Sequence, residues 1–381
     1  MRVLHVINTV EIGGGGEHLL RLTPGLKGFG FDSQVVAGRD GPYAGRLRAL
    51  GIPVTVLGHM NAGSVPGLAR AFLRMRSDLT HLHGSRSGLL GSLAGQLARS
   101  ARLVYTAHAF SFKRHLPRTL HIGTVLAERL ICRLADAVIC LSQEDARAAA
   151  GLGIRPRRLK VIPNGIDPAP FTTARGLRGK LGIDPGTAVI GMIGRLVEDK
   201  DPLTFVRAVA EVSRQLSDAR FLLVGDGPLR GVVEREARNL GVGDRLMITG
   251  IRNDVPELLA TLDVVVLTSR WEGLPLIVLE AMASGRPIVC SKIPTLAEIV
   301  QEGVTGRLVP PGDVAGFADA IVALCTNRTL RLSLGAAAHE YVARTFPLRR
   351  MIEQTADLYA EVLNAPRGSR LTQTTSSDLR A

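Results

Sequence analysis

The sequence predicts an α/β protein made of two doubly wound domains, each a parallel sheet with helices on both faces. Short apolar runs alternate with helical patterns along the chain, which is typical of parallel strands joined by helical crossovers. The 381 residues are more than a single domain usually holds. A segment rich in Pro, Asn and Gly, 163–170, separates the apolar runs into two sets.

The predicted strands form a first set of seven and a second set of six. Ligands of such sheets bind at the carboxyl ends of the strands, so we expect the site in a cleft between two Rossmann-like domains, 1–165 and 166–346. The first set comprises residues 3–8, 33–37, 53–57, 79–82, 103–106, 137–141 and 159–162, and the second 188–193, 219–224, 246–249, 263–268, 287–290 and 306–309.

The charge of the chain is concentrated in its first half. Residues 1–168 hold 22 Lys and Arg against 10 Asp and Glu, a net +12 of the total +13. Nucleic acid, an anionic membrane surface or an acidic acceptor could use this charge. Aromatic residues make up only 4% of the chain, which disfavours nucleic acid. Genome composition would explain why 41 of the 47 basic residues are arginine, but it would not explain why the positive charge is concentrated in the first half of the chain.

Cysteine spacing and hydropathy indicate the compartment. The four cysteines show no Cys-x-x-Cys spacing, so neither a zinc site nor a disulfide framework is indicated. No apolar stretch is long enough to cross a membrane, and the first residues read as a strand rather than a signal peptide. We expect a cytoplasmic protein. Peripheral binding to the cytosolic face of the inner membrane stays open as an alternative. The polar tail 364–381 is expected to be disordered.

The most informative stretch, 268–286, follows a predicted strand. A turn at Glu272-Gly273-Leu274 leads into a helix that Pro275 can start and that carries Glu280 about 7–8 Å along its axis. Backbone N–H groups and the positive end of the helix favour an anion at this point. A ligand whose anionic centre has a hydroxyl-bearing group on either side, one near each glutamate, would fit. A nucleotide sugar has this layout. Two ordinary helix glutamates are the alternative interpretation.

This stretch resembles the Glu-x7-Glu signature of retaining glycosyltransferase family 4, which has the two-domain GT-B fold. The resemblance implies transfer of a sugar from a UDP- or GDP-sugar to an acceptor hydroxyl. It implies that Glu272 holds sugar hydroxyls and that Glu280 holds the ribose. It also implies that a last helix, 347–363, crosses back to the first domain; its apolar or small residues Ile352, Ala356 and Tyr359 share one helical face.

A second stretch, 190–202, places two cations after a strand. The strand ends at Gly194, Arg195 and Lys200 lie in the loop, and Asp201-Pro202 reads as the N-cap and first position of a helix. Such a loop can stabilise the charge that grows on a departing diphosphate. A solvated turn is the alternative. The family's Gly-Arg-Leu-x-x-x-Lys element matches at every fixed position, which supports the first interpretation.

The same loop contains an Asp-x-Asp pattern, Asp199-Lys200-Asp201, which some transferases use to hold a metal. We discount it, because Asp201 has a capping role available and the resemblance implies chemistry without a metal. We therefore expect neither a cofactor nor a metal; the nucleotide sugar is a substrate.

Glycines at three other strand ends also resemble family elements. Gly14, Gly15 and Gly16 follow the first strand and suit contact with phosphate or sugar, with a loose surface loop as the alternative. A dinucleotide-binding pattern is not convincing there. The resemblance places Gly250 beside the nucleobase and gives the turn 225–228 a role in shaping the nucleotide pocket.

Histidines end two strands of the first set. His81 and His83 face the same way and could ligate a metal, but no third ligand is evident from the sequence. The resemblance places the end of this strand, with His83, on the acceptor side. A lone histidine such as His108 is usually a satisfied polar residue, but its strand-end position and the family resemblance suggest that it positions the transferred sugar.

An aromatic and basic segment follows His108. We expect Phe110, Phe112 and Lys113, with the basic residues that follow them, to face the acceptor and an anionic membrane.

The sequence thus favours a retaining hexosyltransferase acting on a lipid-linked saccharide in bacterial surface-polysaccharide synthesis, such as exopolysaccharide. Two alternatives stay open: a sugar-nucleotide epimerase on the same fold, and a non-catalytic binding or scaffold protein. An epimerase would consume donor without acceptor. The scaffold is disfavoured by the intact set of Arg195, Lys200, Glu272 and Glu280.

Overall fold

The computed structural model describes residues 1–11, 13–98, 102–113 and 116–366. The chain forms two compact units: unit 1 combines Met1–Asn164 with Leu348–Ala381, and unit 2 is Gly165–Pro347. The tail expected to be disordered lies outside the described residues from 367 onward. Among the described residues, no helix has both the length and the apolar character to cross a membrane.

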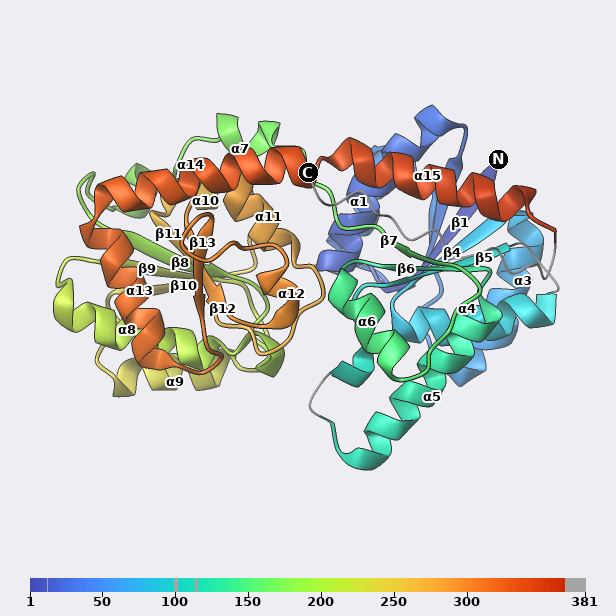
Figure 1. The fold of residues 1–381 in the computed structure, drawn as a ribbon, viewed down its shortest axis with the longest axis horizontal. Coiled ribbons are helices and arrows are strands. Elements are labelled where there is room, and N and C mark those ends of the chain that lie inside the picture. The colour runs from blue at the N-terminus through green and yellow to red at the C-terminus, as the bar shows by residue number, and fades with distance from the viewer. Residues whose placement is uncertain (12, 99–101, 114–115, 367–381) are drawn as a thin grey trace. The chain divides into compact units, whose positions relative to one another are not determined.

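Unit 1 is built on a seven-stranded, fully parallel sheet within its described residues, with helices on both faces (Figure 1). Its central strands are buried on both faces, which explains why they read as continuous apolar runs. The order along the sheet is β3 (Val54–Val56), β2 (Asp32–Arg39), β1 (Arg2–Thr9), β4 (Leu79–His83), β5 (Arg102–Ala107), β6 (Ala137–Cys140) and β7 (Leu159–Val161).

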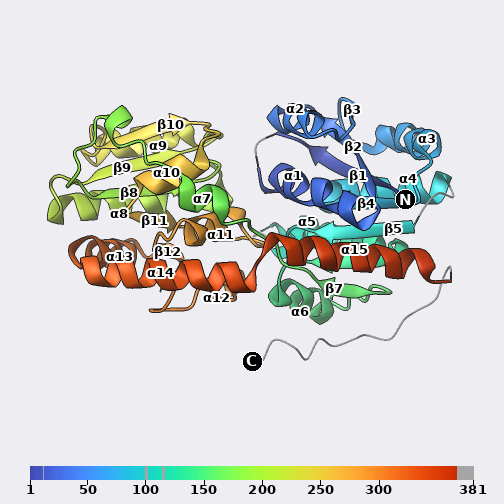
Figure 2. The same ribbon diagram turned by 90° about the horizontal axis from the view of Figure 1, so that it is seen from above.

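The helices of unit 1 include the last helix of the chain, α15. It lies along α1 (Figure 2), and its apolar face packs against that helix. Tyr359 is fully buried, and its ring meets that of Phe31 nearly at right angles. The predicted apolar face of this helix is therefore confirmed. The helices of this unit are α1 (Gly14–Leu26), α2 (Pro42–Ala49), α3 (Val65–Met75), α4 (Ser85–Ala98), α5 (Arg118–Leu134), α6 (Gln143–Gly151) and α15 (Leu348–Asn364).

Unit 2 is built on a six-stranded parallel sheet within its described residues, again covered on both faces (Figure 1). With this sheet, the predicted α/β class and both sets of strands are confirmed, with strand ends within two residues. The order along the sheet is β10 (Leu246–Gly250), β9 (Arg220–Val224), β8 (Val189–Ile193), β11 (Val264–Leu267), β12 (Ile288–Ser291) and β13 (Gly306–Val309).

The helices of unit 2 enclose its core, which gathers Phe205, Phe221 and Phe317 among aliphatic side chains. The first of these helices precedes the sheet, and most of the others connect successive strands. They are α7 (Ala169–Thr173), α8 (Pro202–Gln215), α9 (Arg230–Asn239), α10 (Val255–Thr261), α11 (Leu276–Ala283), α12 (Pro294–Ala297), α13 (Val314–Thr326) and α14 (Arg328–Thr345).

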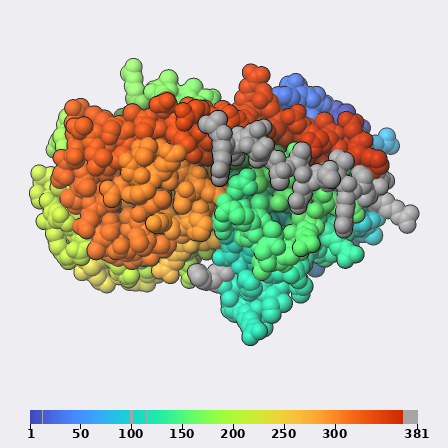
Figure 3. Space-filling view, in the orientation of Figure 1, coloured from blue at the N-terminus to red at the C-terminus, as the bar shows by residue number. Residues whose placement is uncertain are grey.

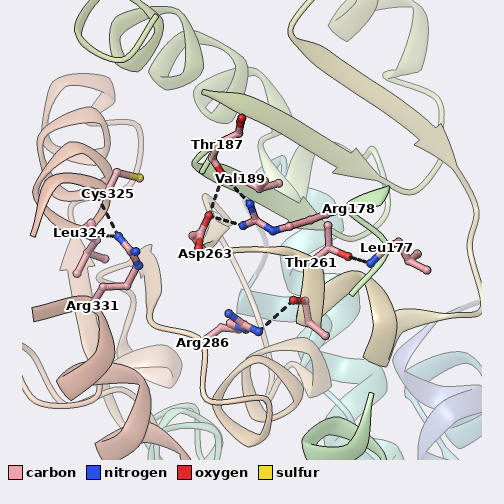
Figure 4. Close-up of polar contacts among 11 residues, drawn as sticks. Leu177, Arg178, Thr187, Val189, Thr261, Asp263, Arg286, Leu324, Cys325 and Arg331 are labelled. Atoms are coloured by element: carbon pink, nitrogen blue, oxygen red, sulfur yellow. Dashed lines mark hydrogen bonds and ion pairs between the residues drawn. The ribbon is translucent and has the colours of Figure 1, made fainter. Parts of the chain in front are cut away.

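A polar network closes the amino edge of the unit 2 sheet (Figure 4). Asp263 Oδ2 accepts hydrogen bonds from Arg178 Nη2 (2.6 Å) and from the backbone N–H of Val189 (2.8 Å). Arg178 also donates to the carbonyl of Thr187 at 2.7 Å. The network fastens the segment before β8 to the start of β11, at the edge opposite the carboxyl ends of the strands.

Candidate functional site

Two loops meet at the carboxyl edge of the unit 2 sheet. One follows β8 and carries Arg195 and Lys200, and the other follows β11, the neighbouring strand. Thr268 Oγ1 donates to the carbonyl oxygens of Lys200 (3.1 Å) and Asp201 (2.8 Å), so the loops are held side by side. Arg195 is exposed in its loop. The two most informative stretches of sequence thus form one site.

An ion pair lies at the centre of this site. Lys200 Nζ donates to Glu272 Oε1 at 2.5 Å, and Ser269 Oγ donates to the same oxygen at 2.6 Å. Glu272 is only 8% exposed, and its carbonyl accepts from Thr295 Oγ1 at 3.1 Å. Charge-assisted hydrogen bonds of this kind are short and strong. A cation and a carboxylate are therefore fixed together at the edge where ligands of such sheets bind.

Asp201 shapes the end of the lysine loop. Its carboxylate accepts from the backbone N–H of Thr204 at 3.3 Å and pairs with Arg270 Nε at 2.8 Å. Pro202 occupies the first turn of α8, and Asp201 itself adopts a left-handed backbone with φ of 45°. The predicted N-cap is therefore confirmed. The carboxylate of Asp201 is thus engaged both in capping α8 and in the ion pair with Arg270.

The turn at residues 225–228, Gly-Asp-Gly-Pro, packs directly on the loop that carries Arg195. A Cβ at Gly225, where φ is 138°, would lie 1.9 Å from the carbonyl oxygen of Gly194. A Cβ at Gly227 would lie 2.4 Å from the carbonyl oxygen of Leu196. Gly225 also donates its N–H to the carbonyl of Gly250 at 2.9 Å. Glycine is required here because backbone packs on backbone.

Helix α11 begins at Leu276, one residue later than expected, because Pro275 is its N-cap and not its first residue. Gly285 follows the end of the helix with φ of 66°. Glu280 lies in the second turn and is 8% exposed. The start of the helix, with its positive dipole end, adjoins the ion pair, and Glu280 lies further along it.

In unit 1 the glycine run forms the first turn of α1 rather than a loose loop. Helix α1 starts at Gly14, with Gly13 at its N-cap. A Cβ on Gly16 would lie 2.3 Å from the ring of Tyr43, and a Cβ on Gly15 would lie 3.1 Å from Ile7. Gly15 and Gly16 therefore serve the close packing of α1, whereas Gly14 has open space around it.

Five histidines form a group that extends from the middle of the unit 1 sheet, at His5 and His81, to its carboxyl end, at His83 and His108. His5 lies on β1 opposite His81 on β4, because the two strands are neighbours in register. His83 Nε2 is 3.1 Å from His5 Nδ1, and its Nδ1 is 3.3 Å from His108 Nε2. His18 on α1 approaches His108, with ring centroids 4.9 Å apart. No third ligand for His81 and His83 is evident from the sequence, but the order of the strands brings His5 close to both.

Burial keeps these histidines neutral. It lowers the pKa of His5 to about 3 and the pKa of His18 to about 4. Burial also lowers the pKa values of His81, His83 and His108 well below 6.5, and the neighbouring histidines add to each effect. A charged imidazole would lose its water and be repelled by the others. At neutral pH each ring therefore offers one N–H and one lone pair.

The structure corrects the expectations for the segment after His108. Phe110 and Phe112 are buried, and their rings stack at 4.9 Å between centroids in the unit 1 core, so neither faces an acceptor. Lys113 Nζ pairs with the fully buried Asp145 at 2.9 Å. Burial raises the pKa of Asp145, and the Lys113 charge partly offsets this. Lys113 thus anchors the segment; residues 114–115 lie outside the described residues.

Comparisons with known proteins agree with this geometry. Residues 12–170 match the family model described as Glycosyltransferase Family 4, and residues 187–327 match the one described as Glycosyl transferases group 1. Among solved structures, Anabaena HepE in complex with UDP-glucose has a TM-score of 0.85 at 25% identity. That match covers 95% of this chain and 100% of that one.

Curated relatives are transferases with different acceptors. The chain is 29% identical over 350 residues to an Escherichia coli UDP-Gal:alpha-D-GlcNAc-diphosphoundecaprenol alpha-1,3-galactosyltransferase, covering 87% of this chain and 90% of that protein. It is 31% identical to a Nocardia farcinica D-inositol 3-phosphate glycosyltransferase, covering 77% and 68%. The chain therefore belongs to glycosyltransferase family 4, has the GT-B fold, and transfers a sugar from a nucleotide-sugar donor.

Proposed function

We propose that this enzyme moves a hexosyl group from a UDP- or GDP-sugar to a hydroxyl of a lipid-linked saccharide, with retention of the anomeric configuration, in bacterial surface-polysaccharide synthesis. The observation that carries the proposal is the Lys200–Glu272 ion pair beside the start of α11. It joins a cation suited to a phosphate with a carboxylate suited to sugar hydroxyls.

The donor would be held by unit 2. Arg195, Lys200 and the start of α11 would stabilise the charge that develops on the departing diphosphate. Glu272 would accept hydrogen bonds from hydroxyls of the transferred sugar, and Glu280 would accept them from the ribose. The backbone around Gly194, Gly250, Gly273 and Leu274 would line the nucleotide site. In a front-face route the leaving phosphate itself takes the proton of the acceptor hydroxyl, and no metal takes part.

Unit 1 would hold the acceptor side. His108 is partly exposed at the carboxyl end of its sheet, while His83 behind it is buried. A neutral His108 can exchange hydrogen bonds with the transferred sugar without adding a positive charge near the anomeric carbon. Gly14, at the open start of α1, would complete this side of the site.

Helix α5 supports an acceptor presented at a membrane. It projects from the body of unit 1, and part of its surface is open to solvent (Figures 1 and 3). Ile122, Leu126 and Leu130 are 50%, 55% and 39% exposed, and their spacing of four residues places them on one face. The opposite face is fixed to the unit, where the buried Glu128 accepts from Tyr105 at 2.9 Å.

Basic side chains border this apolar face. Arg118, Arg129 and Arg133 are exposed on the same helix. A helix with an apolar stripe and flanking arginines suits an anionic lipid surface, where apolar burial and charge attraction add. The Escherichia coli relative is named for a diphosphoundecaprenol-linked acceptor, which is a lipid carrier. Both points support a lipid-linked acceptor for this enzyme.

The test is a transfer assay with purified enzyme, acceptor-bearing vesicles and a panel of labelled UDP- and GDP-sugars, starting with UDP-galactose and GlcNAc-diphosphoundecaprenol. We expect label in the lipid fraction with one donor, and an α-linked product by NMR. A β-linked product would contradict retention. Donor consumed without acceptor would indicate an epimerase, and transfer only to soluble acceptors would remove the lipid-linked part of the proposal.

A further inference from the structure

The histidine group of unit 1 contains a ring nitrogen whose hydrogen-bonding capacity is unused. His18 Nδ1 lies 2.9 Å from Asn164 Oδ1, an oxygen that can only accept, so Nδ1 carries the ring proton. His18 Nε2 is then a bare lone pair. It is buried, and among the described residues it has no hydrogen-bond partner. A buried acceptor left unsatisfied is destabilising, so the site favours a group that takes this lone pair.

The hydrogen bonds of His5 allow a second bare lone pair, on His83. His5 Nε2 is 3.3 Å from Ser33 Oγ and its Nδ1 is 3.1 Å from His83 Nε2. When His83 carries its proton on Nε2, it donates to His5, and His5 donates to Ser33. His83 Nδ1 is then bare and faces His108 Nε2 at 3.3 Å.

The spacing of these nitrogens suits a metal ion. One ring nitrogen from each of His18, His83 and His108 lies within 4.8 Å of the other two. Nitrogen ligands at about 2.0–2.1 Å from a tetrahedral Zn²⁺ stand roughly 3.3 Å apart. Small side-chain rotations would bring the His18 nitrogen to about the 3.3 Å that separates the nitrogens of His83 and His108. Three histidines leave a fourth position open.

We propose that unit 1 binds one divalent transition-metal ion of the zinc class through His18, His83 and His108. Asn164 and His5 would orient two of the ligands. Asn164 hydrogen-bonds His18, and His5 hydrogen-bonds His83, so that the other nitrogen of each ligand ring is free to bind the ion. Imidazole sites select Zn²⁺, Ni²⁺ and Cu²⁺ over Mg²⁺, which prefers oxygen. The site goes beyond the proposed function, which assigns no metal to the transfer step.

An ion at this site would occupy His108, the partly exposed member of the trio. Because His108 is also the proposed sugar-positioning residue, an ion bound here would compete with that role, and we expect it to inhibit transfer.

A second histidine trio is less suitable. One ring nitrogen from each of His5, His81 and His83 also lies within 4.8 Å of the others. However, both nitrogens of His81 are engaged, with Tyr359 OH at 2.5 Å and Thr106 Oγ1 at 2.6 Å. A metal there would break one of these buried hydrogen bonds. This favours the trio that contains His18.

The test is metal titration of the full, tag-free, chelator-treated chain, without nucleotide sugar. We expect one Zn²⁺ per chain by calorimetry, and a Co²⁺ visible spectrum of a four-coordinate nitrogen site. His18→Gln and His108→Gln should each weaken Zn²⁺ binding at least tenfold. Asn164→Ala should weaken it about tenfold, because it removes only the group that orients His18. His59→Gln, at an exposed histidine, is the matched control and should bind as wild type does.

Circular dichroism and melting temperature establish that each variant is folded before titration, and wild-type Co²⁺ binding tests the site independently of any variant. Absence of Zn²⁺ and Co²⁺ binding by wild type would overturn the proposal. Equal affinity in the His18→Gln and His59→Gln variants would do the same, as would loss of binding in His59→Gln. Transfer activity is measured separately in chelator, so failure of the metal site leaves the proposed function untouched.

Discussion

Lys200 Nζ lies 2.5 Å from Glu272 Oε1, so the proposed phosphate-stabilising cation and the proposed sugar-binding carboxylate form one ion pair. Ser269 donates to the same carboxylate oxygen, which fixes its position before any donor arrives. A charge held in place in this way needs little rearrangement during the reaction.

Lys200→Ala should mainly lower turnover. The lysine would act where charge develops on the leaving phosphate, so we expect kcat to fall roughly 100- to 1000-fold with a smaller change in KM. Steady-state kinetics with the identified donor measure this. Normal turnover in Lys200→Ala would refute the leaving-group role. Lys180→Ala, at an exposed lysine elsewhere in unit 2, is the control and should leave kcat unchanged.

Gly225→Ala should disturb the arginine loop. The new Cβ would meet the carbonyl of Gly194, and the backbone φ of 138° disfavours any side chain. The strained φ alone should cost about 1–3 kcal/mol of unfolding free energy, with the clash adding to it. We also expect weaker nucleotide binding, because Gly194 and Arg195 must move. Thermal melting and calorimetry check both. Gly243→Ala has ordinary contacts and should change neither; equal behaviour of the two variants would contradict the packing argument.

Asp263→Ala should separate stability from binding. It removes the acceptor for Arg178 and for the N–H of Val189, so we expect a loss of about 2–3 kcal/mol in unfolding free energy. Nucleotide affinity should persist, because the network lies at the opposite edge of the sheet. Asp319→Ala, at an exposed position, should leave stability unchanged. Lost nucleotide binding at unchanged stability would contradict this assignment.

Replacing Ile122, Leu126 and Leu130 by serine should weaken membrane binding. The triple variant removes the exposed apolar face of α5 while leaving its buried face intact, and we expect about a tenfold loss in partitioning to anionic vesicles. Vesicle co-sedimentation measures this. The matched control replaces three exposed side chains of unit 2, Leu240, Met247 and Leu332, by serine. Equal binding by the two variants would remove α5 as the membrane surface.

Local patterns made much of the fold predictable. Strands such as β4 and β11 are buried on both faces, so they read as unbroken apolar runs between turn residues. The Asp201 cap and the Gly285 helix end follow from short-range chemistry that a few neighbouring residues reveal. In unit 2 the two informative stretches meet because they follow adjacent strands.

Features that depend on long-range contacts were missed. His5 and His83 are 78 residues apart, and only the order of β1, β4 and β5 shows that they touch. Phe110 looked like an exposed aromatic, yet it fills the core. Lys113 looked like a free basic residue, but its partner Asp145 lies 32 positions along the chain. The segment that carries Phe110 and Lys113 has the composition of a surface loop, and only tertiary packing shows that these side chains are held in unit 1.

The most direct test of the central claim is nucleotide binding by thermal shift, with wild type, Glu280→Ala and the exposed-site control Glu340→Ala. A ligand that binds only the folded state raises the melting temperature by mass action. Among UDP, GDP and ADP, we expect UDP or GDP, and one of its sugar conjugates, to stabilise wild type and Glu340→Ala but not Glu280→Ala. If no nucleotide stabilises wild type, or if Glu280→Ala responds as wild type does, the donor site assigned to unit 2 is wrong.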